Sequence, residues 1–185
     1  MIDDILSETS AKMEKAIEAF KKELASIRTG RASTALVDGI KADYHGVPTP
    51  LSHMATITTP EARLLIIQPW DRTALPAIEK AIQKSDLGLN PANDGNMIRL
   101  AIPVLSEERR RELVKIVHKR VEERRVAIRN IRRSALEEIR ELERSKDISQ
   151  DEQRRAQERL QQITDSFIKD VDQVGKDKEE ELLSM

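Results

Sequence analysis

The chain has 185 residues, of which 32 are basic and 33 acidic, so its net charge argues neither for nor against a nucleic-acid partner. It contains no cysteine, which excludes disulfides, thiolate metal sites and thiol nucleophiles. The first ten residues are acidic rather than apolar, and no apolar run approaches the roughly 20 residues of a membrane span, so we expect no signal segment, no membrane association and a soluble cytoplasmic protein.

Proline and glycine divide the chain into three parts. All seven prolines lie between residues 48 and 103, and five of the six glycines lie between residues 30 and 95. Because proline removes a helical hydrogen bond and clashes with the preceding turn, only the flanks are free to form long helices. The pattern predicts a helical body interrupted by a compact insert.

The first flank carries one apolar stripe at helical spacing, which predicts a helix ending near Gly30. The stripe consists of Leu6, Met13, Ile17, Phe20, Leu24 and Ile27.

The insert changes to short apolar runs with turn signals, which are typical of strands. We expect strands at residues 40–44, 55–59, 62–68 and 96–102, with turns at 45–46 and 90–96. One helix is predicted at 73–85, with Asp71 or Thr73 as its cap, Pro76 in its first turn and Gly88 after its end. The insert is therefore a small β/α/β domain.

Two further helices are predicted after the insert. Ser106 is a suitable N-cap for a helix of about 40 residues, and Ser149 with Glu152 forms a capping box for the next helix. Their apolar stripes are Leu113, Val117, Val121, Ile128, Ile131, Ala135, Ile139 and Leu142, and then Ala156, Leu160, Ile163, Phe167, Val171 and Val174.

Three amphipathic helices gain most of their stability by burying their apolar faces together. We therefore predict an α+β protein: an elongated antiparallel three-helix bundle of residues 1–29 and 105–185, with the inserted domain at 30–104. The chain crosses between these parts at Gly30 and Arg31, and again at Pro103 and Val104. Two short crossings are compatible with a hinge or with rigidly packed linkers.

The sequence contains no recognisable arrangement of catalytic residues. His45, His53 and His118 lack the spacing of a metal site or of a base beside a nucleophile, and no phosphate-binding glycine loop occurs. We expect no catalytic residue, metal or cofactor. An enzyme hidden in the insert and using Asp71 or Asp94 is the weakest alternative.

The second long helix has a basic outer face. Residues 105–146 hold 14 basic and 9 acidic side chains, whereas residues 147–185 hold 6 and 11. On a helical projection, six arginines point away from the apolar stripe: Arg111, Arg125, Arg129, Arg132, Arg133 and Arg140. Arginine grips phosphate oxygens in pairs, and the chain has too few aromatic residues to stack many bases, so folded RNA fits better than single strands or DNA. A solvated face with intrahelical ion pairs is the alternative.

Two further residues are more plausibly structural than functional. Arg124 falls close to the centre of the apolar stripe, where a long side chain can cover the edge of the core. Trp70 is expected to be a packing anchor between a strand and a helix rather than an exposed partner contact.

Several segments, in order and covering nearly the whole chain, resemble the bacterial ribosome recycling factors. They are RTGRAST at 28–34, PEARLLIIQPWD at 60–71, IEKAIQKSDLGLNPANDG at 78–95, IRLAIPVLSEERRREL at 98–113 and RNIRRSALEEI at 129–139. The chain departs slightly from the family pattern at Ser134, where members often carry an acid, and at His45, where they often carry a tyrosine.

The resemblance implies an L-shaped, tRNA-like molecule that acts as a monomer on the 70S ribosome after termination. With elongation factor G and GTP it would split the ribosome into subunits and release mRNA and tRNA, without catalysis of its own. The bundle would lie on large-subunit ribosomal RNA, and the insert would swing about its hinge.

The resemblance also implies which residues contact RNA. These are Arg129, Arg132 and Arg133, with Arg132 first, together with Arg28 and Arg31. The basic face adds Arg125. For Arg28 and Arg31 a charge at the end of a helix is the alternative role. A helical adaptor that presents its bundle to a protein is the competing function, and its affinity would depend weakly on salt.

Overall fold

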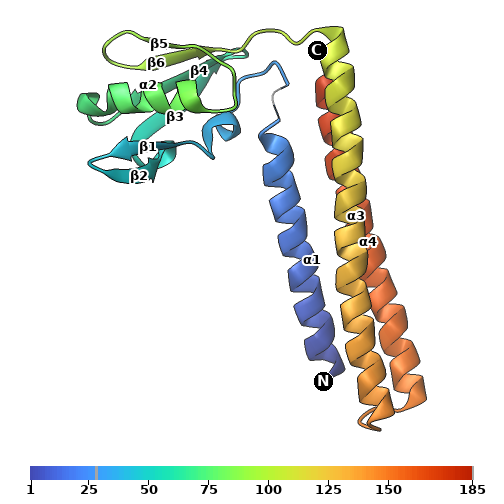
Figure 1. Ribbon diagram of the computed structural model, residues 1–185. Coiled ribbons are helices and arrows are strands. Elements are labelled where there is room, and N and C mark those ends of the chain that lie inside the picture. Colours follow the sequence, from blue (N-terminus) through green and yellow to red (C-terminus); the bar gives the residue numbers. More distant parts are fainter. Residues whose placement is uncertain (28, 185) are drawn as a thin grey trace. The chain divides into compact units, whose positions relative to one another are not determined.

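The computed structural model describes residues 1–27 and 29–184 and divides the chain into two compact units. One unit combines Met1–Leu24 with Arg111–Ser184 and is a helical bundle, and the other spans Ala25–Arg110 and contains the strands (Figure 1). The predicted class, α+β with a three-helix bundle and a small β-containing domain, is confirmed. None of the described helices is long and apolar enough to cross a membrane.

The bundle consists of α1 (Ile2–Ala25), α3 (Glu107–Arg144) and α4 (Gln150–Leu183). The Ser106 hydroxyl accepts the Arg109 N–H at 3.1 Å near the start of α3, and Ser149 and Glu152 form the predicted capping box of α4. Helix α1 ends at Ala25, five residues before the predicted end.

Ion pairs between the helices fix their directions. Glu23 near the end of α1 contacts Arg120 and Arg124 of α3, whereas Asp3 at the start of α1 contacts Arg159 of α4. Arg125 of α3 forms an ion pair with Asp172 of α4, and the earlier His118 is hydrogen-bonded to the later Glu179. Helix α3 therefore runs antiparallel to α4. It also runs antiparallel to α1, because Leu6 near the start of α1 shares a cluster with Ile139 near the end of α3.

The apolar stripes form the core of the bundle. Phe20 and Met13 of α1 are fully buried, and the stripes of the three helices meet around them. At the end of the bundle that contains the connection between α3 and α4, one cluster joins Leu6, Ala135, Leu136, Ile139, Ile148, Ala156 and Leu160. Apolar spacing did not predict the burial of Leu136, which flanks the stripe of α3. It also did not predict the burial of Thr164, Gly175 and Lys178 on α4, because these residue types are not reliably apolar.

Gly175 marks the closest approach of α3 and α4. A methyl group built on its Cα would overlap the side chain of Val121 on α3. Glycine is otherwise unfavourable within a helix, by about 1 kcal/mol relative to alanine. The close packing of the two helices therefore explains the only glycine in the long flanks.

The second unit contains a two-stranded and a four-stranded antiparallel sheet. Strands β1 (Lys41–Tyr44) and β2 (Val47–Pro50) form a hairpin. The larger sheet has the order β3-β4-β6-β5. Its strands are β3 (Ala55–Glu61), β4 (Leu64–Pro69), β5 (Pro91–Asn93) and β6 (Ile98–Ala101).

The predicted turn over residues 90–96 is wrong in part, because Pro91–Asn93 pairs with β6 as an edge strand. Strand β2, with prolines at 48 and 50, was also not predicted. Proline is tolerated in edge strands because one side of the backbone needs no ladder hydrogen bond. The prolines in β2 and β5 are therefore the reason that neither strand was predicted.

Helix α2 (Leu75–Lys84) packs on one face of the four-stranded sheet. Asp71 caps the short 3-10 turn Arg72–Ala74 before it, and Gly88 adopts a φ of 66° after its end. Ile78 and Ile82 of α2 are fully buried in the core that contains Leu65, Ile67, Ile98 and Leu100 from β4 and β6. This arrangement leaves the opposite face of the sheet without a helix among the described residues.

Gly175→Ala should destabilise the bundle by about 1–2 kcal/mol, because an overpacking cost of roughly 1–3 kcal/mol exceeds the gain in helix propensity. Urea unfolding followed by circular dichroism measures the difference. Val121→Ala in the Gly175→Ala background should recover part of the loss, since it removes the obstructing methyl groups. Equal stability of wild type and Gly175→Ala would show that the helices do not pack this closely.

Lys178→Met should stabilise the bundle by about 1 kcal/mol. The Lys178 side chain is buried, so its ammonium group loses hydration on folding, and methionine fills a similar space without that cost. That burial lowers the pKa of Lys178, with Glu181 opposing the shift. The unfolded chain therefore binds more protons than the folded chain between the two pKa values, so this residue makes wild-type stability rise with pH in that window. Thermal unfolding at pH 8 and 10 should show a smaller rise for Lys178→Met than for the exposed control Lys176→Met, and equal rises would contradict the assignment.

Candidate nucleic-acid interface

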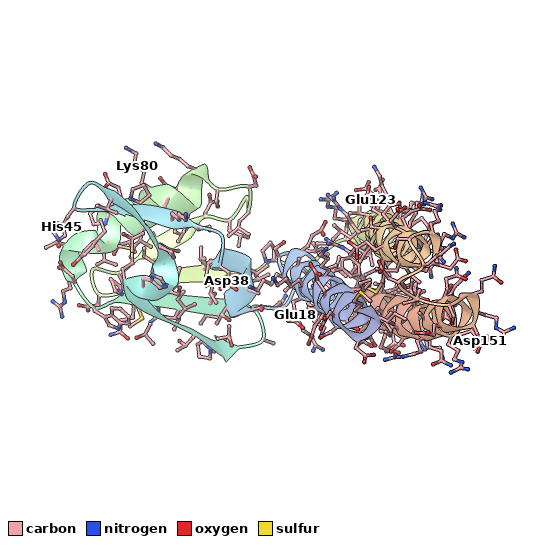
Figure 2. The ribbon with its side chains drawn as sticks, turned by 90° about the horizontal axis from the view of Figure 1, so that it is seen from below. Glu18, Asp38, His45, Lys80, Glu123 and Asp151 are labelled. Carbon is pink, nitrogen blue, oxygen red and sulfur yellow. The ribbon has the colours of Figure 1, made fainter. Side chains whose placement is uncertain are left out.

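Apart from the buried Lys178, most charged groups of the bundle lie on its outside, where the long side chains radiate from the three helices (Figure 2). On α3 the predicted basic face consists of arginines in quite different environments. Some are held by carboxylates of the same or a neighbouring helix, and others are not. This difference determines which of them can receive a ligand.

Arg125 is committed to the bundle. Its Nε–H donates to Asp172 of α4 at 2.7 Å, and its Nη1 lies 3.2 Å from Glu122. The hydrogen bond that Arg125 donates to Asp172, assisted by the charges of both acids, raises the pKa of Arg125. A phosphate would have to compete with two carboxylates for this side chain, so Arg125 stays a prediction with a demonstrated structural role.

Arg129 shares one of these partners. Its Nη1 lies 3.5 Å from Oε1 of Glu122, which also holds Arg125 through Oε2. Both members of this pair are more than half exposed, so water screens the contact and it is weak. Arg129 is therefore available to a stronger anion, and Glu122 is its local competitor.

Arg132 and Arg133 are the least engaged arginines of the face. Neither has an ion pair or hydrogen bond to any residue in the described part of the chain. Arg132 is half-buried and Arg133 exposed. Lying within one turn of Arg129, they give three successive guanidinium groups on the outside of α3.

The other predicted contacts have varied positions. Arg140 pairs with Glu137 on its own helix, as the solvated-face alternative expects, and Arg111 and Arg31 are exposed. Arg28 lies outside the described residues.

The residues of the predicted hinge belong to the second unit. Gly30 has a φ of 86°, a left-handed conformation that favours glycine. Pro103 and Val104 are exposed. These features fit a turn and an extended linker but leave the hinge itself a prediction.

Arg124 bridges α3 to α1. Its guanidinium carbon lies 5.4 Å from the centre of the Phe20 ring, and its Nη2 is 2.8 Å from Glu23. The predicted structural role thus takes a more specific form than covering the core edge: a cation–π contact combined with an interhelical ion pair.

The two acids of the enzyme alternative serve as turn caps. The Asp71 carboxylate accepts the Thr73 N–H at 3.0 Å and hydroxyl at 2.7 Å, as well as the Tyr44 hydroxyl at 3.3 Å. Asp94 accepts the N–H groups of Asn96 and Met97, both at 2.9 Å. These hydrogen bonds lower the pKa of both carboxyls, which suits structural anions rather than proton-transfer groups.

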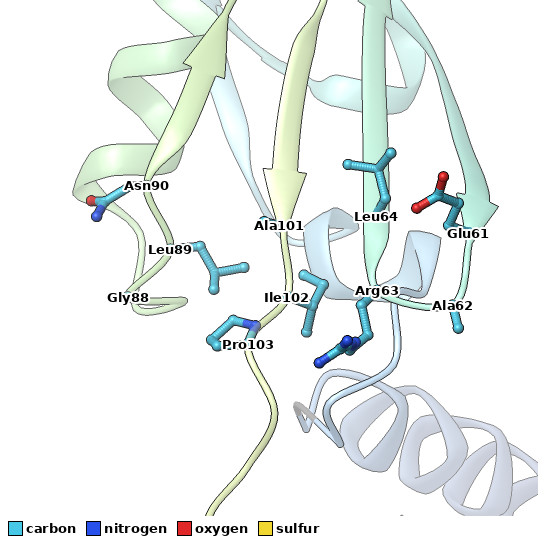
Figure 3. A pocket seen from close by; sticks show the side chains of 10 residues that line it. All are labelled: Glu61, Ala62, Arg63, Leu64, Gly88, Leu89, Asn90, Ala101, Ile102 and Pro103. Carbon is cyan, nitrogen blue, oxygen red and sulfur yellow. The ribbon is translucent and has the colours of Figure 1, made fainter.

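A cavity of about 790 Å³ lies at one end of the four-stranded sheet, between the start of β4, the end of β6 and the loop after α2 (Figure 3). Its charged side chains are Glu61 and Arg63, and most of the rest are aliphatic. No nucleophile paired with a base lines it. Within the described residues no group of three histidine or acidic side chains is arranged to hold a metal ion.

The prediction for Trp70 is wrong. Its side chain is 69% exposed rather than packed in the core, and its indole N–H donates to the Thr56 hydroxyl at 3.0 Å. The buried residue at this point is the preceding Pro69, so the strand ends with proline inside and tryptophan outside. Sequence alone could not decide which of the two neighbours faces the core.

The structure thus defines a class: an α+β protein that joins a helical bundle with a cationic outer face to a small antiparallel β unit. A family model described as "Ribosome recycling factor" matches residues 20–183. Curated relatives named ribosome-recycling factor include those of Carboxydothermus hydrogenoformans, 57% identical over the full length of both chains, and of Thermomicrobium roseum, 53% identical over the same extent. The chain belongs to the ribosome recycling factor family.

Solved structures agree. A solution structure of the ribosome recycling factor shares 48% identity with a TM-score of 0.80, covering 100% of this chain and 98% of that one. A second neighbour, with 47% identity, a TM-score of 0.69 and 99% coverage of each chain, is the T. thermophilus factor in models with the E. coli elongation factor G bound to the E. coli post-termination complex.

Proposed function

We propose that this chain recycles ribosomes: it binds the 70S ribosome after termination and, with elongation factor G and GTP, separates the subunits so that mRNA and tRNA are released. Its membership of the family supports this function, as does the structural neighbour, a recycling factor that with elongation factor G is bound to a post-termination complex. The observation that carries the proposal on this chain itself is the cationic outer face of α3, with Arg132 and Arg133 unengaged by described residues.

The proposed contact is between this face and large-subunit ribosomal RNA. Arginine side chains form paired, charge-assisted hydrogen bonds with phosphate oxygens, which are stronger than neutral hydrogen bonds. Arg129, Arg132 and Arg133 lie within about one turn of α3, so their side chains can contact neighbouring phosphates on a folded RNA surface. Arg28, Arg31 and Arg125 are secondary candidates.

The rest of the proposal concerns movement and energy. The bundle of residues 1–29 and 105–185 would hold the ribosome, and the insert of residues 30–104 would turn about Gly30, Arg31, Pro103 and Val104. The chain would act as a cytoplasmic monomer without catalysis, because the partner hydrolyses GTP. Contacts that differ between joined and separated subunits are what shift that equilibrium.

The direct test follows subunit separation by light scattering. Purified protein is mixed with post-termination ribosomes, elongation factor G and GTP, and each component is omitted in turn. Separation should require all of them. Intact ribosomes in the complete mixture, with an authentic recycling factor active in parallel, would refute the proposed function and favour a helical adaptor.

Arg132→Ala should weaken binding to large ribosomal subunits by about 10- to 100-fold at physiological salt, because a charge-assisted hydrogen bond contributes roughly 1.5–3 kcal/mol. It should also reduce the slope of log affinity against log salt by about 0.7–1, as expected for one lost phosphate contact. Filter binding across a salt series measures both quantities.

Arg144→Ala is the matched control for this experiment. It removes the same charge from the same helix, but Arg144 lies at the end of α3 and pairs with Glu137 and Glu141. The control should bind with nearly wild-type affinity. If Arg132→Ala binds as tightly as wild type, the RNA contact is misplaced.

Glu122→Gln should strengthen binding to large subunits by about two- to fivefold at low salt, because exposed ion pairs contribute a few tenths to 1 kcal/mol and this carboxylate competes with phosphate for Arg129. The gain should shrink as salt rises. Glu8→Gln, which alters an exposed pair with Lys12 on α1, should change affinity little. Weaker binding by Glu122→Gln would mean that Glu122 positions the arginines rather than competing for them.

A further inference from the structure

Polar contacts between α3 and α4 recur every seven residues along the two helices. Nε2 of His118 on α3 lies 2.9 Å from Oε2 of Glu179 on α4. Seven residues further along α3, Arg125 donates to Asp172, which lies seven residues earlier on the antiparallel α4. Seven residues are almost two turns of an α-helix, so each step advances about 10 Å and returns to nearly the same side of both helices. The series therefore shows which side chains of α3 and α4 face each other.

The next step of this series places Arg132 of α3 opposite Asp165 of α4. The helices are still in contact beyond this step, because Ala135 of α3 and Leu160 of α4 belong to one core cluster. Arg132 is half-buried, as Arg125 is. An ion pair between Arg132 and Asp165 would be the third contact of the series, but Arg132 forms none with any described residue.

A hydrogen bond within α4 explains why this third contact is missing. The side-chain amide of Gln161 donates from Nε2 to Oδ1 of Asp165 at 2.8 Å. Glutamine and aspartate four residues apart form a stabilising pair on a helix. Asp172 has no such partner, because the residue four positions before it is Ile168, whose side chain cannot donate a hydrogen bond. The residue four positions before each aspartate therefore distinguishes the aspartate that holds an arginine from the one that does not.

We infer that Gln161 is a positioning residue that keeps Arg132 available to RNA by holding the Asp165 carboxylate on α4. This inference rests on the proposed function and extends it to a residue outside the arginine face. A carboxylate released from Gln161 would compete with phosphate for the guanidinium group of Arg132, as Glu122 does for that of Arg129. While Gln161 holds Asp165, Arg132 can bind a phosphate without first breaking an interhelical ion pair.

Binding to large ribosomal subunits at low salt tests the role of Gln161. Gln161→Ala should weaken binding about two- to fivefold, because a phosphate must then displace Asp165 from Arg132 and exposed ion pairs contribute factors of about this size. The loss should shrink as salt rises and screens the pair. Gln173→Ala is the matched control, since it removes a hydrogen bond of the same kind on α4, from Gln173 to Asp177 at 2.7 Å, outside the seven-residue series. The control should bind as tightly as wild type.

The double variant Gln161→Ala/Asp165→Asn separates positioning from a general effect on α4. It lacks the carboxylate that would capture Arg132, so it should bind large subunits at least as tightly as wild type. A role of Gln161 in the stability of α4 alone would leave the loss in place. A loss that persists in the double variant therefore overturns the inference, and so does wild-type binding by Gln161→Ala.

Urea unfolding of the free protein tests the same contact without a ribosome. Arg132→Ala and Asp165→Asn are made singly and together, in wild type and in Gln161→Ala. Their coupling should be negligible in wild type and should change the unfolding equilibrium constant about two- to fivefold in the Gln161→Ala background. No coupling in that background overturns the inference. Failure of the wild-type protein to bind large subunits would refute the proposed function and the inference with it, and the coupling in the free protein distinguishes the two failures.

Discussion

Helix α3 has to satisfy two demands along the same 38 residues, and the rest of the molecule depends on how it does so. One side must be apolar enough to pack against α1 and α4, and the other must remain soluble and cationic. Arginines next to the apolar stripe form ion pairs with acids of the neighbouring helices: Arg124 with Glu23, and Arg125 with Asp172. Arginines further round the helix, such as Arg132 and Arg133, form no ion pair with an acid among the described residues. Bundle packing itself thus separates structural cations from those available to a ligand.

The sequence predicted the parts of this structure that depend on local patterns. Apolar spacing gave the three long helices, and the caps at Ser106 and Ser149 predicted two of their starts because a side-chain oxygen acts on backbone groups only a few residues away. The two edge strands were missed for the opposite reason. Pro48 and Pro91 look like turn residues until the position of the strand at a sheet edge is known, and that position is a property of the tertiary fold.

The candidate site shows the same division. Helical projection found the basic face. It could not show that Arg125 is held by an acid 47 residues away, or that Glu122 accepts hydrogen bonds from both Arg125 and Arg129. Likewise, the alternation of buried and exposed residues along β4 continues to Pro69 and Trp70, but only the burial of Pro69, which is paired with the buried Ala55, shows that tryptophan lies on the outside. Long-range pairing decides which polar or aromatic residue remains available.

The arginine face that we propose to lie on RNA has a physical character that suits a factor acting repeatedly. Phosphate contacts are long-ranged and screened by salt, so they would speed association. Glu122 would limit how tightly those contacts hold, because its carboxylate lies 3.5 Å from Arg129 and competes with phosphate for that side chain. On this proposal, the arginines that form interhelical ion pairs stabilise the bundle, and the weakly paired or unpaired arginines, such as Arg129, Arg132 and Arg133, remain able to bind and release a ligand.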